Sequence, residues 1–159
     1  MKDLRIKTIV SGGQTGADRA ALDFALERGL QIAGFVPRGR RAEDGRIDEK
    51  YAGLVETVSA RYGERTELNV RQADATLIVS HGELTGGSRL TAEMAARFGK
   101  PFLHLDLSRT STGEAAARAR LWVHALDCET LNVAGPRASE DREIYEKTKD
   151  FLRALFGGG

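Results

Sequence analysis

The chain has little that would point to a disulfide-stapled, metal-bound or membrane-spanning protein. Its 159 residues include one cysteine, Cys128, which excludes an intramolecular disulfide and a multi-cysteine metal site. The three histidines, His81, His104 and His124, are scattered without metal-ligand spacing, so no metal site is predicted. No N-terminal signal peptide or long apolar run is visible. We therefore expect a cytoplasmic protein with no membrane partner.

An excess of one charge is also lacking. The 24 Lys and Arg residues against 23 Asp and Glu residues give a formal net charge of +1. Such a balance provides no bulk field that would attract a polyanion, so nucleic acid is not an expected partner. The length and the 41% hydrophobic content suit one domain, and we predict a single nucleotide- or pterin-phosphate-binding domain over residues 1–159.

Strand and helix patterns alternate along the chain. Five short apolar runs have the composition of strands: residues 6–10, 30–36, 77–80, 101–105 and 131–134. Helical patterns separate them, the last one beginning near Ser139, and no hairpin turn signal is present. This predicts an α/β fold with a Rossmann-like doubly wound, mostly parallel sheet and helices on both faces. Ligands of such sheets bind beyond the carboxyl ends of the strands, where four loops should converge: 11–16, 37–48, 80–88 and 135–138.

The most informative segment is 9–18, Ile-Val-Ser-Gly-Gly-Gln-Thr-Gly-Ala-Asp, in which a β-branched run passes through a glycine turn into a helical pattern. A helix N-terminus offers free backbone N–H groups and a partial positive charge, so it binds anions without dedicated side chains. The predicted phosphate contacts in this turn are Gly12, Gly13, Gln14, Thr15 and Gly16. A tight turn whose glycines serve packing alone is the competing interpretation.

The same segment argues against two common nucleotide sites. It lacks the Gly-Lys-Ser/Thr ending of a P-loop, and its glycines do not follow the G-x-G-x-x-G pattern. ATP hydrolysis and dinucleotide binding are therefore not expected. Asp18, three residues after Thr15, either completes a capping box or faces the ligand, and both interpretations stay open.

Two further turns repeat this strand–turn–helix geometry. One follows the strand 77–80, and the other, Gly135-Pro136-Arg137, follows the strand 131–134. Together they add the predicted anion contacts Thr85, Gly86, Gly87, Ser88 and Arg137. Arg38, just after the second strand, is predicted to supply a guanidinium to the same ligand. The alternative for Arg38 is a solvated loop that Glu43 and Asp44 neutralise.

A polar stretch before the third strand contributes one more candidate surface. On a helix, the spacing of Tyr62, Arg65, Thr66 and Asn69 places the four residues on one face. This face is either a ligand wall, with Arg65 and Asn69 as contacts, or a helix surface that packs on the sheet edge.

No set of a nucleophile, a base and an acid is recognisable. Ser11, Ser80 and Ser88 have no partner that the sequence can assign, and serines are common in turns. Among the histidines only His81 is near the predicted crevice. We therefore expect a binding protein rather than an enzyme.

Taken together, the motifs resemble those of the molybdenum cofactor carrier-like family. The residues that carry the resemblance are Ser11–Asp23, Pro37–Gly45, Arg65-Thr66, Asn69-Val70, Thr85–Ser88 and Asn132–Arg137. The resemblance implies a Rossmann-like fold related to the Lonely Guy and DprA proteins, and a role in binding or carrying the molybdenum cofactor, a phosphorylated pterin. It also implies molybdoenzymes or cofactor-synthesis proteins as partners, and a homo-oligomer.

Kinship with the Lonely Guy proteins raises an alternative, a nucleoside 5′-monophosphate phosphoribohydrolase. That family carries Pro-Gly-Gly-x-Gly-Thr-x-x-Glu, and here Glu93 occupies the place of its acidic residue. In this alternative Glu93 is the catalytic residue. The chain departs from the pattern at Thr85, Arg89 and Leu90, which stand where the family has Pro, Gly and Thr.

Overall fold

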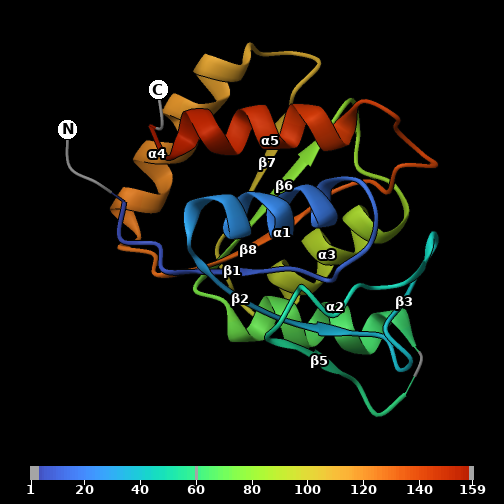
Figure 1. Cartoon of the computed structure of the whole chain (residues 1–159). Helices are drawn as coiled ribbons and strands as arrows, with labels where there is room; N and C mark the ends of the chain where they lie inside the picture. The colour runs from blue at the N-terminus through green and yellow to red at the C-terminus, as the bar shows by residue number, and fades with distance from the viewer. Residues whose placement is uncertain (1–3, 60, 158–159) are drawn as a thin grey trace.

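The computed structural model describes residues 4–59 and 61–157 and shows a parallel sheet with helices on both faces (Figure 1). The sheet strands are β1 (Thr8–Val10), β2 (Gln31–Val36), β5 (Leu54–Glu56), β6 (Ala75–Ser80), β7 (Phe102–Asp106) and β8 (Thr130–Ala134). Their order is β5-β2-β1-β8-β6-β7, and all neighbouring pairs are parallel. The predicted Rossmann-like α/β fold is therefore confirmed.

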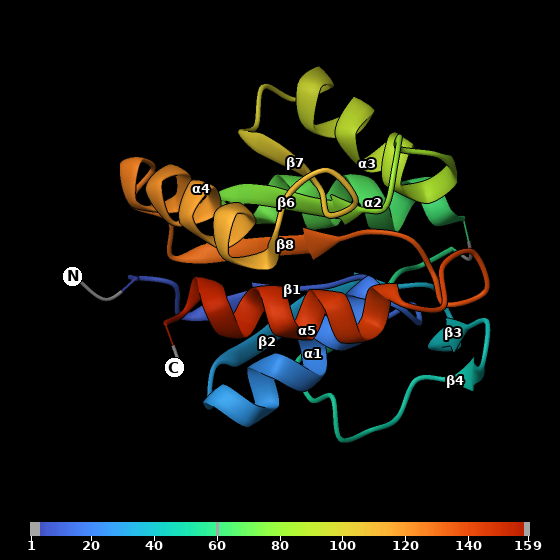
Figure 2. The ribbon, with the colours of Figure 1, turned by 90° about the horizontal axis from the view of Figure 1, so that it is seen from above.

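The helices form two groups. They are α1 (Ala17–Arg28), α2 (Tyr62–Gln72), α3 (Gly86–Arg97), α4 (Thr112–Ala125) and α5 (Ile144–Leu155). α5 packs against both α1 and α4, whereas α2 packs against α3 (Figure 2). The larger buried apolar cluster joins α1, α4 and α5 to the sheet, with Phe24, Leu131 and Phe151 among its fully buried members. Burial of these side chains supplies the main driving force for folding.

Local signals define several helix ends. α1 ends at Gly29, whose φ of 73° is left-handed and whose N–H bonds the carbonyls of Ala25 and Leu26. α4 begins after Ser111, whose side chain accepts a hydrogen bond of 3.1 Å from the Glu114 N–H. Local chemistry therefore sets both ends.

Three local features differ from the sequence-based expectations. A two-stranded hairpin, β3 (Arg41–Ala42) with β4 (Gly45–Arg46), is present although no hairpin was expected, because charged residues replace the usual alternation. The edge strand β5 was missed, since three residues are too few to show a period. α5 begins at Ile144 rather than near Ser139, because the N–H groups of Glu140 and Asp141 both bond the Arg137 carbonyl in a preceding turn.

The position of β8 decides where a ligand can bind. This last strand lies between β1 and β6. The chain that leaves β1 continues to β2 on one side of β8, and the chain that leaves β6 continues to β7 on the other side. Because the connections diverge there, the carboxyl ends of β1, β8 and β6 leave an opening between them. In open α/β sheets this is the usual place of a ligand site.

Candidate functional site

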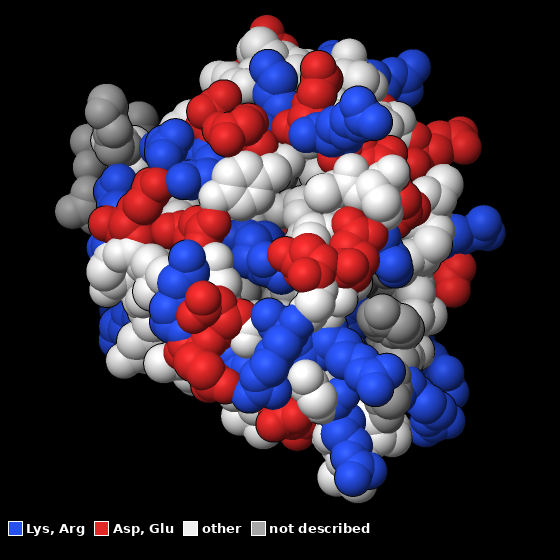
Figure 3. Space-filling view, turned by 45° about the vertical axis from the view of Figure 1, so that its right-hand side comes forward, with Lys and Arg blue, Asp and Glu red and all other residues white. Residues whose placement is uncertain are grey.

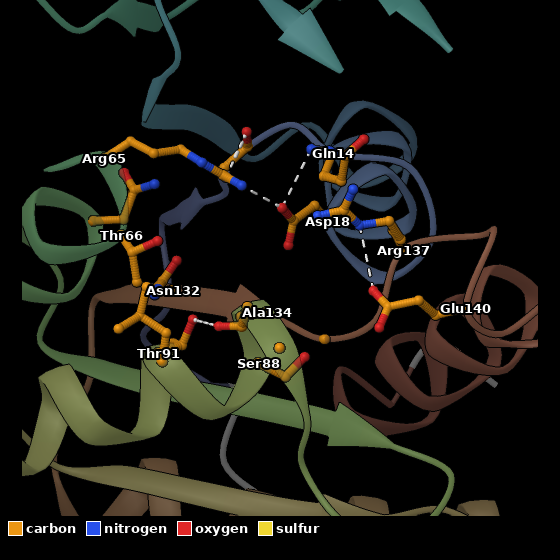
Figure 4. Close-up of a pocket in the computed structure, with 16 residues that line it drawn as sticks. Gln14, Asp18, Arg65, Thr66, Ser88, Thr91, Asn132, Ala134, Arg137 and Glu140 are labelled. Atoms are coloured by element: carbon orange, nitrogen blue, oxygen red, sulfur yellow. Dashed lines mark hydrogen bonds and ion pairs between the residues drawn. The ribbon is translucent and has the colours of Figure 1, made fainter. Parts of the chain in front are cut away.

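A cavity of about 250 Å³ lies at these strand ends, between the β1–α1 turn, the β8–α5 loop, α2 and the start of α3 (Figure 4). Eight predicted site residues line it: Gly12, Gln14, Arg65, Asn69, Gly86, Gly87, Ser88 and Arg137. Three of the four predicted loops therefore meet here. The loop 37–48 contributes no lining residue, and the predicted helix face on α2 takes its place.

The N-terminus of α3 is open toward this cavity. Among the described residues, the backbone N–H groups of Gly86, Gly87 and Ser88 have no hydrogen-bond acceptor. The preceding residue, Thr85, provides no side-chain cap, and the first turn contains no acidic residue. Three unoccupied donors at the positive end of a helix constitute a site for an anion such as a phosphate.

The β1–α1 turn, in contrast, is closed by its own hydrogen bonds. The Gly13 N–H bonds the Ser11 hydroxyl at 3.1 Å, and the Gln14 N–H bonds Oδ2 of Asp18 at 3.2 Å. The next N–H, of Thr15, bonds the Gln14 side chain at 3.0 Å. Most of the donors expected to cradle a phosphate in this turn are therefore used to shape the turn itself.

Two glycines of this turn face protein rather than the cavity. A Cβ atom on Gly13 would lie 2.7 Å from Cδ1 of Ile47, and one on Gly16 would lie 2.3 Å from the Pro136 carbonyl oxygen. Both residues have φ of 76°. Gly16 thus permits the close approach of the β1–α1 turn to the β8–α5 loop, which the Ala17 N–H fastens through a 3.1 Å bond to Pro136.

The remaining predicted contacts lie outside the cavity. Arg38 is exposed, and its neighbour Arg40 is the buried arginine, donating to the carbonyls of Ile47 and Asp48 within the hairpin segment. Thr15 donates to Glu43 and accepts from the Ala138 N–H. Thr85 lines a smaller adjoining hollow of about 80 Å³ instead.

A buried pair of opposite charges lines the wall of the cavity. Oδ2 of Asp18 lies 3.7 Å from Nη1 of Arg65, and the same nitrogen donates to the Gly12 carbonyl at 3.0 Å. Burial raises the pKa of Asp18 above its ordinary value, while the positive charge of Arg65 acts in the opposite direction. Asp18 therefore closes the turn through the Gln14 N–H and lines the cavity. It does not complete a capping box with Thr15, because the N-cap residue is Gly16 and has no side-chain cap bond.

A second charged pair lies near the start of α3. Nε of Arg137 is 3.3 Å from Oε1 of Glu140, and the other Glu140 oxygen lies 3.7 Å from the place that a Cβ on Gly86 would take. A carboxylate of the protein itself is therefore close to the open N–H groups. Glu140 carries no motif signal in the sequence, because its place depends on the turn that precedes α5.

Several other residues that line the cavity were not among the ligand contacts predicted from the sequence. Thr66, which the sequence placed on the candidate ligand wall, lines the cavity, and Asn132, which belongs to a recognised motif, lines it as well. Thr91, whose hydroxyl donates to the Gly87 carbonyl at 2.9 Å, is a further lining residue. The side chain of Tyr62, the fourth residue of the predicted face, lies outside the described residues. Glu93 does not line the cavity, since its side chain is 61% exposed and pairs with Arg89 at 3.2 Å.

Two histidines have structural partners. Ser80 Oγ lies 2.6 Å from Nε2 of His104 and donates a 2.6 Å bond to the Gly82 carbonyl, so its proton is directed at a backbone acceptor. Burial lowers the pKa of His104. His81 Nδ1 lies 2.6 Å from Asp141 and so ties the β6–α3 loop to the β8–α5 loop. Neither histidine has the surroundings of a general base for an exposed nucleophile.

Charged side chains of both signs share the molecular surface. Acidic and basic side chains are interspersed over the face shown in Figure 3, in agreement with the balanced composition. Over residues 4–59 and 61–157, no group of three potential metal-ligating side chains is found. In the same part of the chain no helix combines the length and apolar character needed to cross a bilayer.

Comparison with known proteins agrees with this architecture. The model of the circularly permutated YpsA SLOG family matches residues 9–156. The chain is also similar to a solved structure of a protein from Syntrophus aciditrophicus SB named "Putative molybdenum carrier protein", with 49% sequence identity, a TM-score of 0.95 and 97% of each chain covered. No curated protein matches the chain. The resemblance to molybdenum carriers, drawn from the motifs alone, is confirmed by this relative.

Proposed function

This chain belongs to the circularly permutated YpsA SLOG family, and we propose that it binds and carries a phosphorylated heterocycle in the cavity at the strand ends, with the molybdenum cofactor as the ligand. The observation that carries the proposal is the open N-terminus of α3, whose first three residues line a cavity of about 250 Å³ at the strand ends. The name of the 49% identical relative supports the choice of a molybdenum-related cargo.

The cavity separates naturally into a phosphate end and a ring end. At the phosphate end, the N–H groups of Gly86, Gly87 and Ser88 would hold the oxyanion, and the guanidinium of Arg137 lies beside them. At the ring end, Asp18 and Asn132 provide polar groups that can position a planar heterocycle. The β1–α1 turn then serves as a rigid wall rather than as the phosphate cradle.

Glu140 gives the phosphate end an internal competitor. Its carboxylate lies near Gly86 and is paired with Arg137, so an incoming phosphate meets a negative charge that must turn away. Because the Glu140 side chain is 44% exposed, it has room to rotate into solvent when the phosphate arrives. Release of the cargo would be aided by the return of this carboxylate.

The test is native mass spectrometry of the protein incubated anaerobically with molybdenum cofactor and AMP together. The proposal expects a retained molybdopterin mass and intact AMP. Release of adenine and ribose 5-phosphate would overturn it in favour of a phosphoribohydrolase. Absence of any bound phosphorylated molecule would refute the carrier proposal, and the same spectra would report whether the protein is a homo-oligomer.

A further inference from the structure

One carboxylate oxygen in the cavity lacks a donor. Asp18 is only 7% exposed, and its Oδ2 is engaged by the Gln14 N–H and by Arg65. Within the described residues, Oδ1 receives no hydrogen bond. Figure 4 shows this second oxygen directed away from Arg65 and Gln14, into the space between the labelled residues.

Because this oxygen faces the cavity, it can accept a hydrogen bond from a ligand that supplies an N–H. Arg65 already balances the charge of the carboxylate, so the missing partner is a hydrogen-bond donor rather than a cation. The opposite side of the cavity presents the α3 donors to a phosphate. The ligand should therefore carry a phosphate at one end and N–H donors at the other.

Planar heterocycles differ in the donors that they present along one edge. A 2-amino-4-oxo ring, as in pterins and guanine, presents an exocyclic amine beside a ring N–H, so two donors point the same way. Adenine places a ring lone pair next to its amine, and that lone pair would oppose the carboxylate. A carboxylate is accordingly a selective acceptor for the former edge.

We propose that Asp18 determines ring specificity by accepting the N–H groups of a 2-amino-4-oxo heterocycle. This assignment rests on the proposed function and narrows its ligand class to phosphorylated pterins and guanine nucleotides. Asn132 and Thr66 also line the cavity and add polar groups to its wall.

The test compares two matched pairs of compounds by titration calorimetry. The first pair is GMP and IMP, which differ only in the 2-amino group. The second is 6-hydroxymethylpterin phosphate and its counterpart with oxygen in place of that amine. One hydrogen bond to a charged acceptor predicts that the amino compound of each pair binds about tenfold more tightly. Pyrophosphate, which has no ring, is the probe for the phosphate end alone.

The variant Asp18→Asn separates ring recognition from structure. The Gln14 N–H still requires an acceptor, so the new amide oxygen takes the place of Oδ2 and the amide NH₂ faces the cavity. The preference within each pair should fall to about one or reverse, because a donor then meets a donor. Asp127→Asn, at an exposed residue paired with Arg5, is the matched control and should keep the native preference.

The outcomes distinguish the two proposals. Equal binding within both pairs by the native protein, or a preference that persists in Asp18→Asn, would overturn the role of Asp18 while pyrophosphate binding leaves the carrier function standing. A uniform loss of affinity in Asp18→Asn with an unchanged preference would show a purely structural carboxylate and would also overturn it. Failure of all the compounds, pyrophosphate included, would overturn both proposals.

Discussion

Replacing Gly87 by Asp should separate ligand binding from stability. Gly87 lies in the first turn of α3, its φ is not left-handed, and a Cβ atom there would meet nothing within 4 Å. The first turn contains no acidic residue, so an Asp would interact favourably with the helix dipole. We expect the free energy of unfolding to rise by about 0.5–1 kcal/mol.

The same carboxylate would oppose a bound phosphate. Two unit charges about 5 Å apart repel by about 3 kcal/mol at an effective dielectric constant of about 20, which corresponds to about a hundredfold loss of affinity. The new side chain would also compete for the N–H groups of Gly86 and Ser88. Stability and affinity are therefore predicted to move in opposite directions.

The assay is titration calorimetry with 6-hydroxymethylpterin phosphate, together with urea denaturation. Gly87→Asn is the control, because it has nearly the same size without the charge, and it should retain most of the affinity. Full affinity in folded Gly87→Asp, or an equal loss in both variants, would refute an anion site at this helix. Gly13→Asp would not serve, since its side chain would collide with Ile47 and destabilise the fold.

Three further changes test other parts of the structure. Glu140→Gln should raise the affinity for pyrophosphate about fivefold in calorimetry, because it removes the negative charge beside the α3 N-terminus, and lower affinity would contradict this role. Gly16→Ala should lower the free energy of unfolding by about 3 kcal/mol or more, since its Cβ would lie 2.3 Å from the Pro136 oxygen, whereas Gly29→Ala, at a similar φ with open space, should cost only about 1 kcal/mol. Burial lowers the pKa of His104 in the folded protein, so the unfolded chain binds more protons as the pH falls, and the free energy of unfolding decreases. His104→Gln should therefore reduce the difference in the free energy of unfolding, measured with urea, between about pH 7.5 and about pH 5.5. An unchanged difference would refute this assignment.

The sequence was sufficient for the fold class because alternation of short apolar runs and helical patterns is a local property. The runs at 77–80 and 131–134 lie within β6 and β8. The hairpin was not predictable in this way, because its pairing depends on buried Arg40 rather than on an alternating pattern. Where local period and composition carry the signal, the sequence is enough.

The candidate site could be predicted only in part from the sequence. The motifs pointed to the β1–α1 and β6–α3 turns as equivalent anion cradles. In the first turn, however, the Ser11 hydroxyl and the Asp18 carboxylate accept hydrogen bonds from backbone N–H groups, whereas among the described residues the N–H groups at the start of α3 have no acceptor. No spacing rule separates the two, since each closing bond depends on side-chain direction. The contact between Ser80 and His104 could not be predicted from the sequence either, because it depends on the pairing of two different strands, β6 and β7.

The sequence by itself determined the α/β architecture, the glycine turns at strand ends and the motifs that the chain shares with its 49% identical relative. Only the tertiary structure decided that the last strand, β8, enters the middle of the sheet and that the N–H groups of Gly13, Gln14 and Thr15 are used within the β1–α1 turn itself. It also decided that Asp18 meets Arg65, 47 positions along the chain (65 − 18), at the cavity wall. Local chemistry determines which elements form, whereas contacts between distant residues determine which of their polar groups remain available to a ligand.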